Sequence, residues 1–289
     1  MKSSRVIVLL LLLVTNSYAV DILNIHGLHT VSFDPHESPS DIYFTKDFFY
    51  IYESVKGEIL KFSSKDFNLI SRKRLESGEG GIAIAYYKNR WYLSANRQGS
   101  INVYDENFDL MGKHKSIAKD PTDMEFYGEY GFIVDNDNHK ILKVNINTWE
   151  KEGETGVFGF NENQFRFPFD IKIDERGDIF VSEVINTRVQ VFNQKLKFVD
   201  FVGGWGIKSG EFYRPKGIEF YKNYLLVADG YTGVVQLFDK QKRTFSKVLG
   251  EDGKIKRFTA PTRLRVLGNI LGIVDYFNKK IYIYELDKL

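Results

Sequence analysis

Six charged residues stand at matching places in a repeated segment and have the chemistry of a ligand site. The set contains three aspartates, each two residues after a repeat start, one glutamate and two arginines. These residues are Asp41, Asp123, Glu125, Asp170, Arg263 and Arg265. Convergent carboxylates supply the oxygen ligands that hard cations prefer, so Asp41, Asp123 and Asp170 predict a site for Ca²⁺ or another hard divalent cation. The two arginines suit a carboxylate or phosphate group on a ligand.

The same residues allow a second interpretation. Close opposite charges can neutralise one another around a water-filled channel without any ligand. Ile82 and Ile84 take the corresponding places in the second copy of the repeat, which interrupts a complete ring of coordinating groups. Both interpretations stay open at the level of the sequence.

Other chemistries find little support in the residues. The chain has no cysteine, which excludes disulfides, thiolate metal sites and a cysteine nucleophile. It contains no G-x-S-x-G elbow, and none of its five histidines falls on a predicted inner strand. The glycine runs 78–81 and 203–204 do not lie between a strand and a helix, so a phosphate-binding loop is not expected there.

The elements that must position the charged residues are short strands in six copies of one unit. The copies begin near residues 39, 80, 121, 168, 215 and 261, and the last four recur every 46 or 47 residues. Each contains short period-two runs rich in Ile, Val, Phe and Tyr, which favour strands over helices. The pattern predicts an all-β, six-bladed β-propeller of four-stranded antiparallel blades.

Two further features concern how such a ring is completed. The sixth copy ends soon after its third strand, and the segment 22–33 has strand composition without a unit of its own. We therefore expect this N-terminal strand to close the ring, since an open ring would leave unpaired edges. The acidic residues that end each second strand, such as Asp135 and Asp229, are expected to bind the backbone of the following turn.

The fourth copy carries a family resemblance. Phe165, Pro168 and Asp170, followed by Asn186 and the stretch 188–192 (RVQVF), resemble the NHL-repeat propellers. Glu183 stands where that family usually has Asp, and the fifth copy lacks its Asn and Arg. The resemblance implies a six-bladed propeller, here an exported bacterial member, that acts as an interaction module.

The N-terminal segment predicts the compartment. Residues 1–19 have a basic start, an apolar run and small residues at Ser17 and Ala19, as in a secretory signal peptide cut after Ala19. We expect a periplasmic or secreted protein with one domain, 20–289, no membrane span after cleavage and a monomeric state. Loss of Lys2 and Arg5 would leave as many basic as acidic residues, which gives no electrostatic case for binding nucleic acid.

Taken together, these features predict an exported, non-catalytic protein that uses one propeller face to engage a protein partner or ligand. Trp205, in the linker before the fifth copy, is the expected partner contact, because tryptophan is enriched at interface hot spots. The alternative is a cation-dependent hydrolase or lyase with its site in the central channel. No haem or flavin signature occurs, so a hard cation is the one cofactor that the residues suit.

Overall fold

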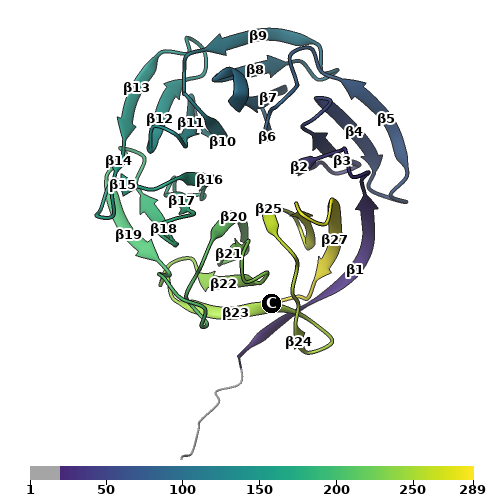
Figure 1. The fold of residues 1–289 in the computed structure, drawn as a ribbon, viewed down its shortest axis with the longest axis vertical. Coiled ribbons are helices and arrows are strands. Elements are labelled where there is room, and N and C mark those ends of the chain that lie inside the picture. The colour runs from purple at the N-terminus through teal and green to yellow at the C-terminus, as the bar shows by residue number, and fades with distance from the viewer. Residues whose placement is uncertain (1–19) are drawn as a thin grey trace, which may run out of the picture.

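The fold is entirely built from strands and turns. The computed structural model describes residues 20–289, and the predicted signal segment lies outside them. Four sheets contain four antiparallel strands each (Figure 1). In chain order they are β2 (Pro39–Phe44), β3 (Phe48–Glu53), β4 (Glu58–Ser63) and β5 (Leu69–Arg74); β6 (Ala83–Tyr87), β7 (Arg90–Ala95), β8 (Ser100–Tyr104) and β9 (Leu110–Lys115); β10 (Pro121–Tyr127), β11 (Tyr130–Asp135), β12 (Lys140–Asn145) and β13 (Lys151–Thr155); and β16 (Pro168–Ile173), β17 (Ile179–Glu183), β18 (Arg188–Phe192) and β19 (Phe198–Val202).

The two ends of the chain meet in one larger, nine-stranded sheet. Its members are β20 (Pro215–Tyr221), β21 (Tyr224–Asp229), β22 (Val235–Asp239), β23 (Phe245–Glu251), β24 (Lys254–Ile255), β25 (Pro261–Leu267), β26 (Ile270–Asp275), β27 (Lys280–Leu286) and β1 (Ile22–Ser32). The first residues of β1 pair in parallel with β23, and the rest of β1 pairs antiparallel with β27. The N-terminal strand therefore lies beside the last strand of the chain.

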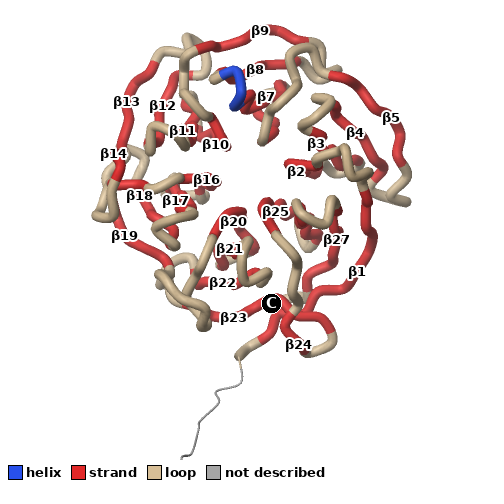
Figure 2. The backbone as a smooth tube through the Cα atoms, viewed as in Figure 1, coloured by secondary structure: helices blue, strands red, loops and turns tan. Residues whose placement is uncertain are grey.

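The sheets are arranged in a ring around a central axis, with β2, β6, β10, β16, β20 and β25 innermost (Figure 1). Two short pieces lie outside this pattern: the parallel pair β14 (Val157–Phe158) and β15 (Gln164–Phe165), and the 3₁₀ turn η1 (Asn96–Gln98), which is blue in Figure 2. The predicted all-β class is confirmed, and the four-stranded antiparallel sheets are consistent with a propeller. Within residues 20–289, no helix is long and apolar enough to cross a membrane.

Apolar side chains fill the space between neighbouring sheets. Five of six buried clusters join one sheet to the next around the ring; one, for example, brings Ile42 of β2 against Val274 of β26. The sixth cluster lies within the nine-stranded sheet and packs β20–β22 against β25–β27. Phe165 and Phe212, which precede two of the repeat prolines by three residues, are completely buried. Burial of one such side chain stabilises the fold by about 1.5–3 kcal/mol, so the repeated phenylalanines are packing residues.

The acidic residues that end the second strands bind backbone as expected. Asp229 accepts hydrogen bonds from the N–H groups of Tyr231 and Thr232 in the following turn. It also accepts from Tyr213 and Arg214, which lead into β20. One carboxylate thus fixes both its own turn and the linker that enters the same sheet, which explains why the feature recurs.

The inner strands depart from simple alternation at their first residues. The register shifts directly after the initial proline in β2, β10, β16, β20 and β25. Such a bulge inserts one extra residue and re-aims a side chain. The second sheet differs because its inner strand begins at Ala83, after the glycines at 80 and 81, and Gly80 has φ of 73°. In five of the six copies, the residue directly after the repeat start lines the mouth of the channel.

Candidate functional site

The six predicted charged residues lie on the inner strands, and five of them form one buried network. Arg263 is 1% exposed, and its Nη1 lies 3.2 Å from Asp123 Oδ2 and 3.0 Å from Asp170 Oδ1. Arg265 Nη2 lies 3.0 Å from Asp41 Oδ2. These contacts are the ones expected if opposite charges pair across the channel.

Each of the three aspartates also joins two neighbouring sheets. The Oδ2 atoms of Asp41, Asp123 and Asp170 accept hydrogen bonds from inner-strand N–H groups of the next sheet, those of Ile84, Ile171 and Ile218, at 2.9, 3.1 and 3.0 Å. A carboxylate that is occupied by an arginine and by backbone has few lone pairs left for a cation. Among residues 20–289, no group of three His, Asp or Glu side chains is arranged to hold a metal ion, and the predicted cation site stays a prediction.

Burial and neighbouring charges act in opposite directions on these groups. Burial disfavours the charged form of Asp123, but Arg263 and Lys172 outweigh it and hold its pKa well below the usual range. Burial and the adjacent charge of Asp123 raise the pKa of Asp170. Two carboxylates beside one arginine therefore differ in their affinity for a proton.

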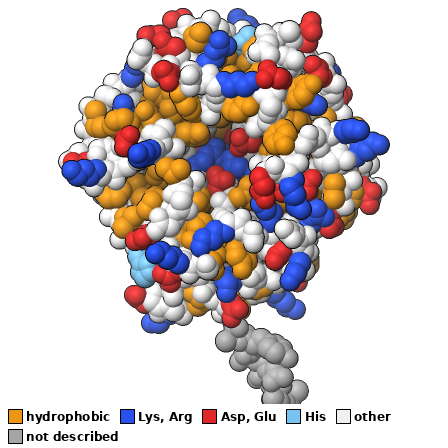
Figure 3. Space-filling model, turned by 180° about the vertical axis from the view of Figure 1, so that it is seen from behind, with side chains coloured by type: hydrophobic (Ala, Val, Ile, Leu, Met, Phe, Trp, Pro, Cys, Tyr) orange, Lys and Arg blue, Asp and Glu red, His pale blue; other side chains and the backbone are white. Residues whose placement is uncertain are grey.

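Glu125 joins this network through Lys172, whose Nζ lies 3.9 Å from Asp170 Oδ1, whereas Trp205 lies apart from it. Glu125 lies further along β10, where its Oε2 is 3.4 Å from Nζ of buried Lys172. Figure 3, seen from behind, shows acidic and basic side chains gathered in the central hollow, with hydrophobic side chains around it. Trp205 is 76% exposed in the linker before β20 and does not line the cavity at the channel mouth.

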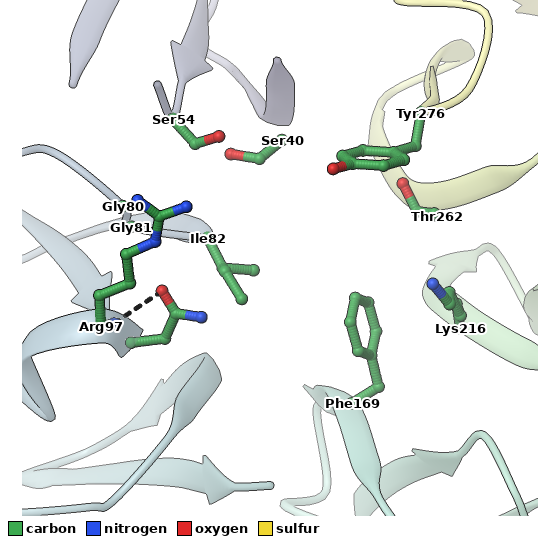
Figure 4. Close-up of a pocket in the computed structure, with 11 residues that line it drawn as sticks. Ser40, Ser54, Gly80, Gly81, Ile82, Arg97, Phe169, Lys216, Thr262 and Tyr276 are labelled. Atoms are coloured by element: carbon green, nitrogen blue, oxygen red, sulfur yellow. Dashed lines mark hydrogen bonds between the residues drawn. The ribbon is translucent and has the colours of Figure 1, made fainter. Parts of the chain in front are cut away.

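That cavity has a volume of about 370 Å³ and opens where the inner strands begin (Figure 4). Four sheets contribute to its wall, since the inner strands and the turns after the second strands both reach it. Its lining residues are Ser40, Ser54, Gly80, Gly81, Ile82, Asn96, Arg97, Phe169, Lys216, Thr262 and Tyr276.

These residues differ from the six predicted charged residues, although the sequence contains a signal for them. Ser40, Gly81, Phe169, Lys216 and Thr262 each directly follow a repeat start. The chemical type changes from copy to copy at this place, whereas the residues that pack the sheets keep theirs. Period-two alternation selects the next residue of each copy and does not predict the bulge after the proline, so it passes over the residues that line the cavity.

Lys216 is the amine of the cavity. Its stem lies next to Gly230, which has no side chain to cover it, and its Nζ is 5.1 Å from the centroid of the Phe169 ring. Burial lowers the pKa of Lys216, and the positive charges of Arg214 and Arg263 lower it further. No carboxylate of residues 20–289 lies within ion-pair distance of it, so no neighbouring negative charge opposes this lowering of its pKa.

Arg97 faces Lys216 from the other side of the cavity (Figure 4). Its side chain lies directly over Gly80, where any Cβ would collide with it. The backbone N–H of Arg97 is fixed by Asn96 Oδ1 at 2.9 Å, which holds the turn η1 in place. The guanidinium makes no ion pair with a carboxylate of the described chain and is exposed, so its donors remain free for a ligand.

Hydroxyl groups and one aromatic ring complete the wall. Tyr276 reaches inward from the turn after β26, above Thr262 (Figure 4). Ser54 donates to the Ser38 carbonyl at 3.1 Å, so it is held close to the rim. With two cations, several hydroxyls, and neither carboxylate nor histidine among its lining residues, the cavity suits an anionic or carbonyl-bearing molecule.

Comparisons with known proteins identify the fold. No protein-family model matches the chain, and no curated protein matches it in sequence. The chain resembles a catalytically inactive histidine-to-alanine variant of virginiamycin B lyase from Staphylococcus aureus with quinupristin, with a TM-score of 0.66, 10% identity, and 90% of this chain and 99% of that chain covered.

Two other solved structures are also similar. A streptogramin B lyase has a TM-score of 0.66 and 9% identity, over 90% of this chain and 97% of that one. A protein of unknown function from Bacteroides thetaiotaomicron has a TM-score of 0.68 and 16% identity, over 93% of this chain and 73% of that one. At these identities the likeness shows the fold alone.

The comparisons correct the main functional expectation. The sequence favoured a non-catalytic binding protein, but propeller enzymes of the lyase class are prominent among the similar structures. The findings agree better with the lyase part of the alternative than with a non-catalytic binding protein. The earlier preference followed from the NHL resemblance, which no family model supports.

Proposed function

We propose that this chain is a lyase whose active site is the cavity between Lys216 and Arg97. The observation that carries the proposal is the placement of these two cations on opposite sides of one cavity, without a carboxylate partner among the described residues. The substrate class is a molecule with an acidic C–H next to a carboxylate or other carbonyl group, and a leaving group on the following carbon.

The reaction follows from the positions of the groups. Lys216 Nζ takes the proton from the carbon next to the carbonyl, and the electron pair of that C–H bond forms a carbon–carbon double bond. The bond to the leaving group breaks, and the leaving group departs with its electron pair and takes a proton from the Tyr276 hydroxyl. Arg97 stabilises the negative charge that develops on the carbonyl oxygen. Solvent then returns one proton to Tyr276 and removes one from Lys216, so protons balance.

The lowered pKa of Lys216 supports its role as base. A general base is most effective when its pKa lies near the working pH, and burial is a common way to lower that of a lysine. The virginiamycin B lyase variant described above is inactive after loss of one histidine. The cavity of this chain has no histidine among its lining residues, and Lys216 is the side chain that we propose in such a role.

The finer architecture is part of the proposal. We infer a six-bladed β-propeller with NHL-type repeats, in which β1 supplies the outer strand of the last blade. The pairing of β1 with β27 and the six inter-sheet clusters support this. We further infer export with cleavage after Ala19, which N-terminal sequencing of protein recovered from the periplasm or medium tests.

The test uses two probe sets in ¹⁸O-labelled water: quinupristin, and a series of 3-acyloxy carboxylates. A lyase splits its substrate without adding water, so its products carry no label and gain a double bond, whereas hydrolysis incorporates ¹⁸O. Replacement of Lys216 by Ala should lower kcat by about 10²–10⁴-fold. Replacement of exposed Lys242 by Ala is the matched control and should leave kcat unchanged. Labelled products, no cleavage of either set, or an unaffected Lys216→Ala variant would refute the proposal.

A further inference from the structure

The rim around the cavity differs sharply between its two sides. Strands β3, β7, β11, β17, β21 and β26 each have one rim residue two positions after their end. In chain order these residues are Val55, Arg97, Asp137, Ile185, Tyr231 and Phe277. Four of these are apolar or aromatic, and they follow one another around the ring, because strands β25–β27 pack against the sheet of β2–β5. The charged pair, Arg97 and Asp137, occupies the remaining side. The four apolar residues are called the apolar arc below.

The apolar arc is exposed although it consists of side chains that normally pack inside. Phe277 is 72% exposed and Tyr231 is 63% exposed. Tyr231 stacks on Tyr213 with ring centroids 4.2 Å apart, and Phe277 lies 5.7 Å from Tyr276. Large apolar side chains that stay exposed together at the mouth of a cavity indicate a binding surface.

The apolar arc is continuous with the cavity. Tyr276 and Ser54 line the cavity, and Phe277 and Val55 follow them directly in the chain. Gly230, which precedes Tyr231, is packed against the stem of Lys216. A molecule seated in the cavity and extending over the rim on this side therefore meets apolar groups.

The opposite side supplies charge. Arg97 lines the cavity and also belongs to the rim, and its guanidinium has no ion-pair partner within residues 20–289. One end of a bound molecule thus meets an arginine and the other end meets aromatic rings. This polarity fixes the direction in which a ligand lies across the channel mouth.

We propose that the substrates are amphiphilic anions, with the acidic head group between Arg97 and Lys216 and a bulky aromatic or apolar body on the apolar arc. That these anions are substrates rests on the proposed function. The direction in which such an anion binds across the channel mouth can be measured without turnover. Aromatic anchors dominate binding energies at such surfaces, so their removal has a large expected effect.

The experiment measures equilibrium binding of three probes by calorimetry: 2-naphthylacetate, acetate and 2-naphthylethylamine. We expect 2-naphthylacetate to bind at least about tenfold more tightly than either of the others, because it alone has both the acidic group and the apolar body. The double variant Tyr231→Ser/Phe277→Ser should lose that advantage and bind the two carboxylates equally. Arg97→Gln should weaken both carboxylates, and Met111→Ser, at an exposed site on outer strand β9, is the control that changes neither.

The outcomes separate this inference from the proposed function. Selective binding of 2-naphthylacetate without turnover of any acyloxy carboxylate supports the apolar arc as a binding surface and refutes the proposed lyase activity. Turnover that is unchanged in the double variant supports the lyase activity and overturns the proposal that substrates bind to the apolar arc. Equal affinity for 2-naphthylacetate and 2-naphthylethylamine would also overturn it. A protein that shows no selectivity among the three probes, but binds neutral phosphatidylcholine vesicles through Tyr231 and Phe277, would overturn it as well.

Discussion

Arg263 of β25 crosses the channel to Asp170 of β16, and its Nη1 lies 3.0 Å from Asp170 Oδ1 with both side chains buried. Its Nη2 donates to the Thr122 carbonyl at 2.5 Å, so one side chain links three inner strands. The charges most suggestive of a ligand site in the sequence therefore hold the strands together. Lys216, the lysine that lines the cavity, directly follows a repeat start and stands one position earlier in its copy than these charges do in theirs.

The first prediction concerns this arginine. Replacement of Arg263 by Met leaves Asp123 and Asp170 buried with less compensating charge. Loss of one partner from a buried pair typically costs about 3–5 kcal/mol, and we expect a loss of that size in the free energy of unfolding, measured in urea. Replacement of exposed Arg90 by Met should change it by less than about 0.5 kcal/mol. Equal stability of the two variants would contradict the network.

The second prediction concerns acid. Burial acts against the charge of Glu37, but hydrogen bonds from Lys56 and Arg72 outweigh it and lower the pKa of Glu37 to about 2. A depressed native pKa gives stability that is present above the unfolded value of about 4.3 and is lost as the pH falls toward 2. Glu37→Gln should therefore be less stable than the parent at pH 7, and the difference should vanish near pH 2. A difference in urea midpoint that stays constant with pH would exclude this linkage.

The third prediction concerns Lys216 and needs no substrate. Because burial and two arginines lower its pKa, more of its amine is unprotonated at pH 8 than in an ordinary lysine. Brief reductive methylation followed by peptide mass spectrometry should label Lys216 faster than exposed Lys242. Lowering the pH to 6 should reduce the labelling of both. Slower labelling of Lys216 at pH 8 would mean that its amine is not available for base catalysis.

The fourth prediction concerns a close approach of two inner strands. A Cβ at Gly217 of β20 would lie 2.8 Å from the Cα of Arg263 and 2.9 Å from the Thr262 carbonyl oxygen. Backbone cannot yield as a flexible side chain can, so Gly217→Ala should cost about 1–3 kcal/mol of unfolding free energy. At Gly204 an added Cβ meets nothing within 4 Å, and Gly204→Ala is the neutral control. If both variants unfold at the same urea concentration, the two strands are further apart than described.

The sequence predicted the strand content well and the cavity poorly, for physical reasons. Strand composition and the repeat depend on packing, which selects the same residue types in each copy, as at Phe165 and Phe212. A cavity depends on the differences between copies, such as lysine at 216 against serine at 40. The bulge that turns both residues toward the channel mouth leaves no mark in an alternating pattern. Arg97 and Lys216 are also far apart in the sequence, so the sequence does not indicate that they line one cavity.

The last prediction concerns the N-terminal strand. Ile25 of β1 is fully buried in the cluster that also contains Leu286 of β27, whereas Leu28 on the same strand is 40% exposed. If β1 is an integral part of the fold, Ile25→Ala should lower the unfolding free energy by about 2–5 kcal/mol, because it leaves a cavity in that cluster. Leu28→Ala, the same kind of truncation on the same strand, should cost less than about 1 kcal/mol. A weakly held β1 would also expose the edges of β23 and β27, so Ile25→Ala should aggregate at lower urea concentrations than the parent in light scattering. A small effect of Ile25→Ala on both measurements would show that the fold is stable without β1.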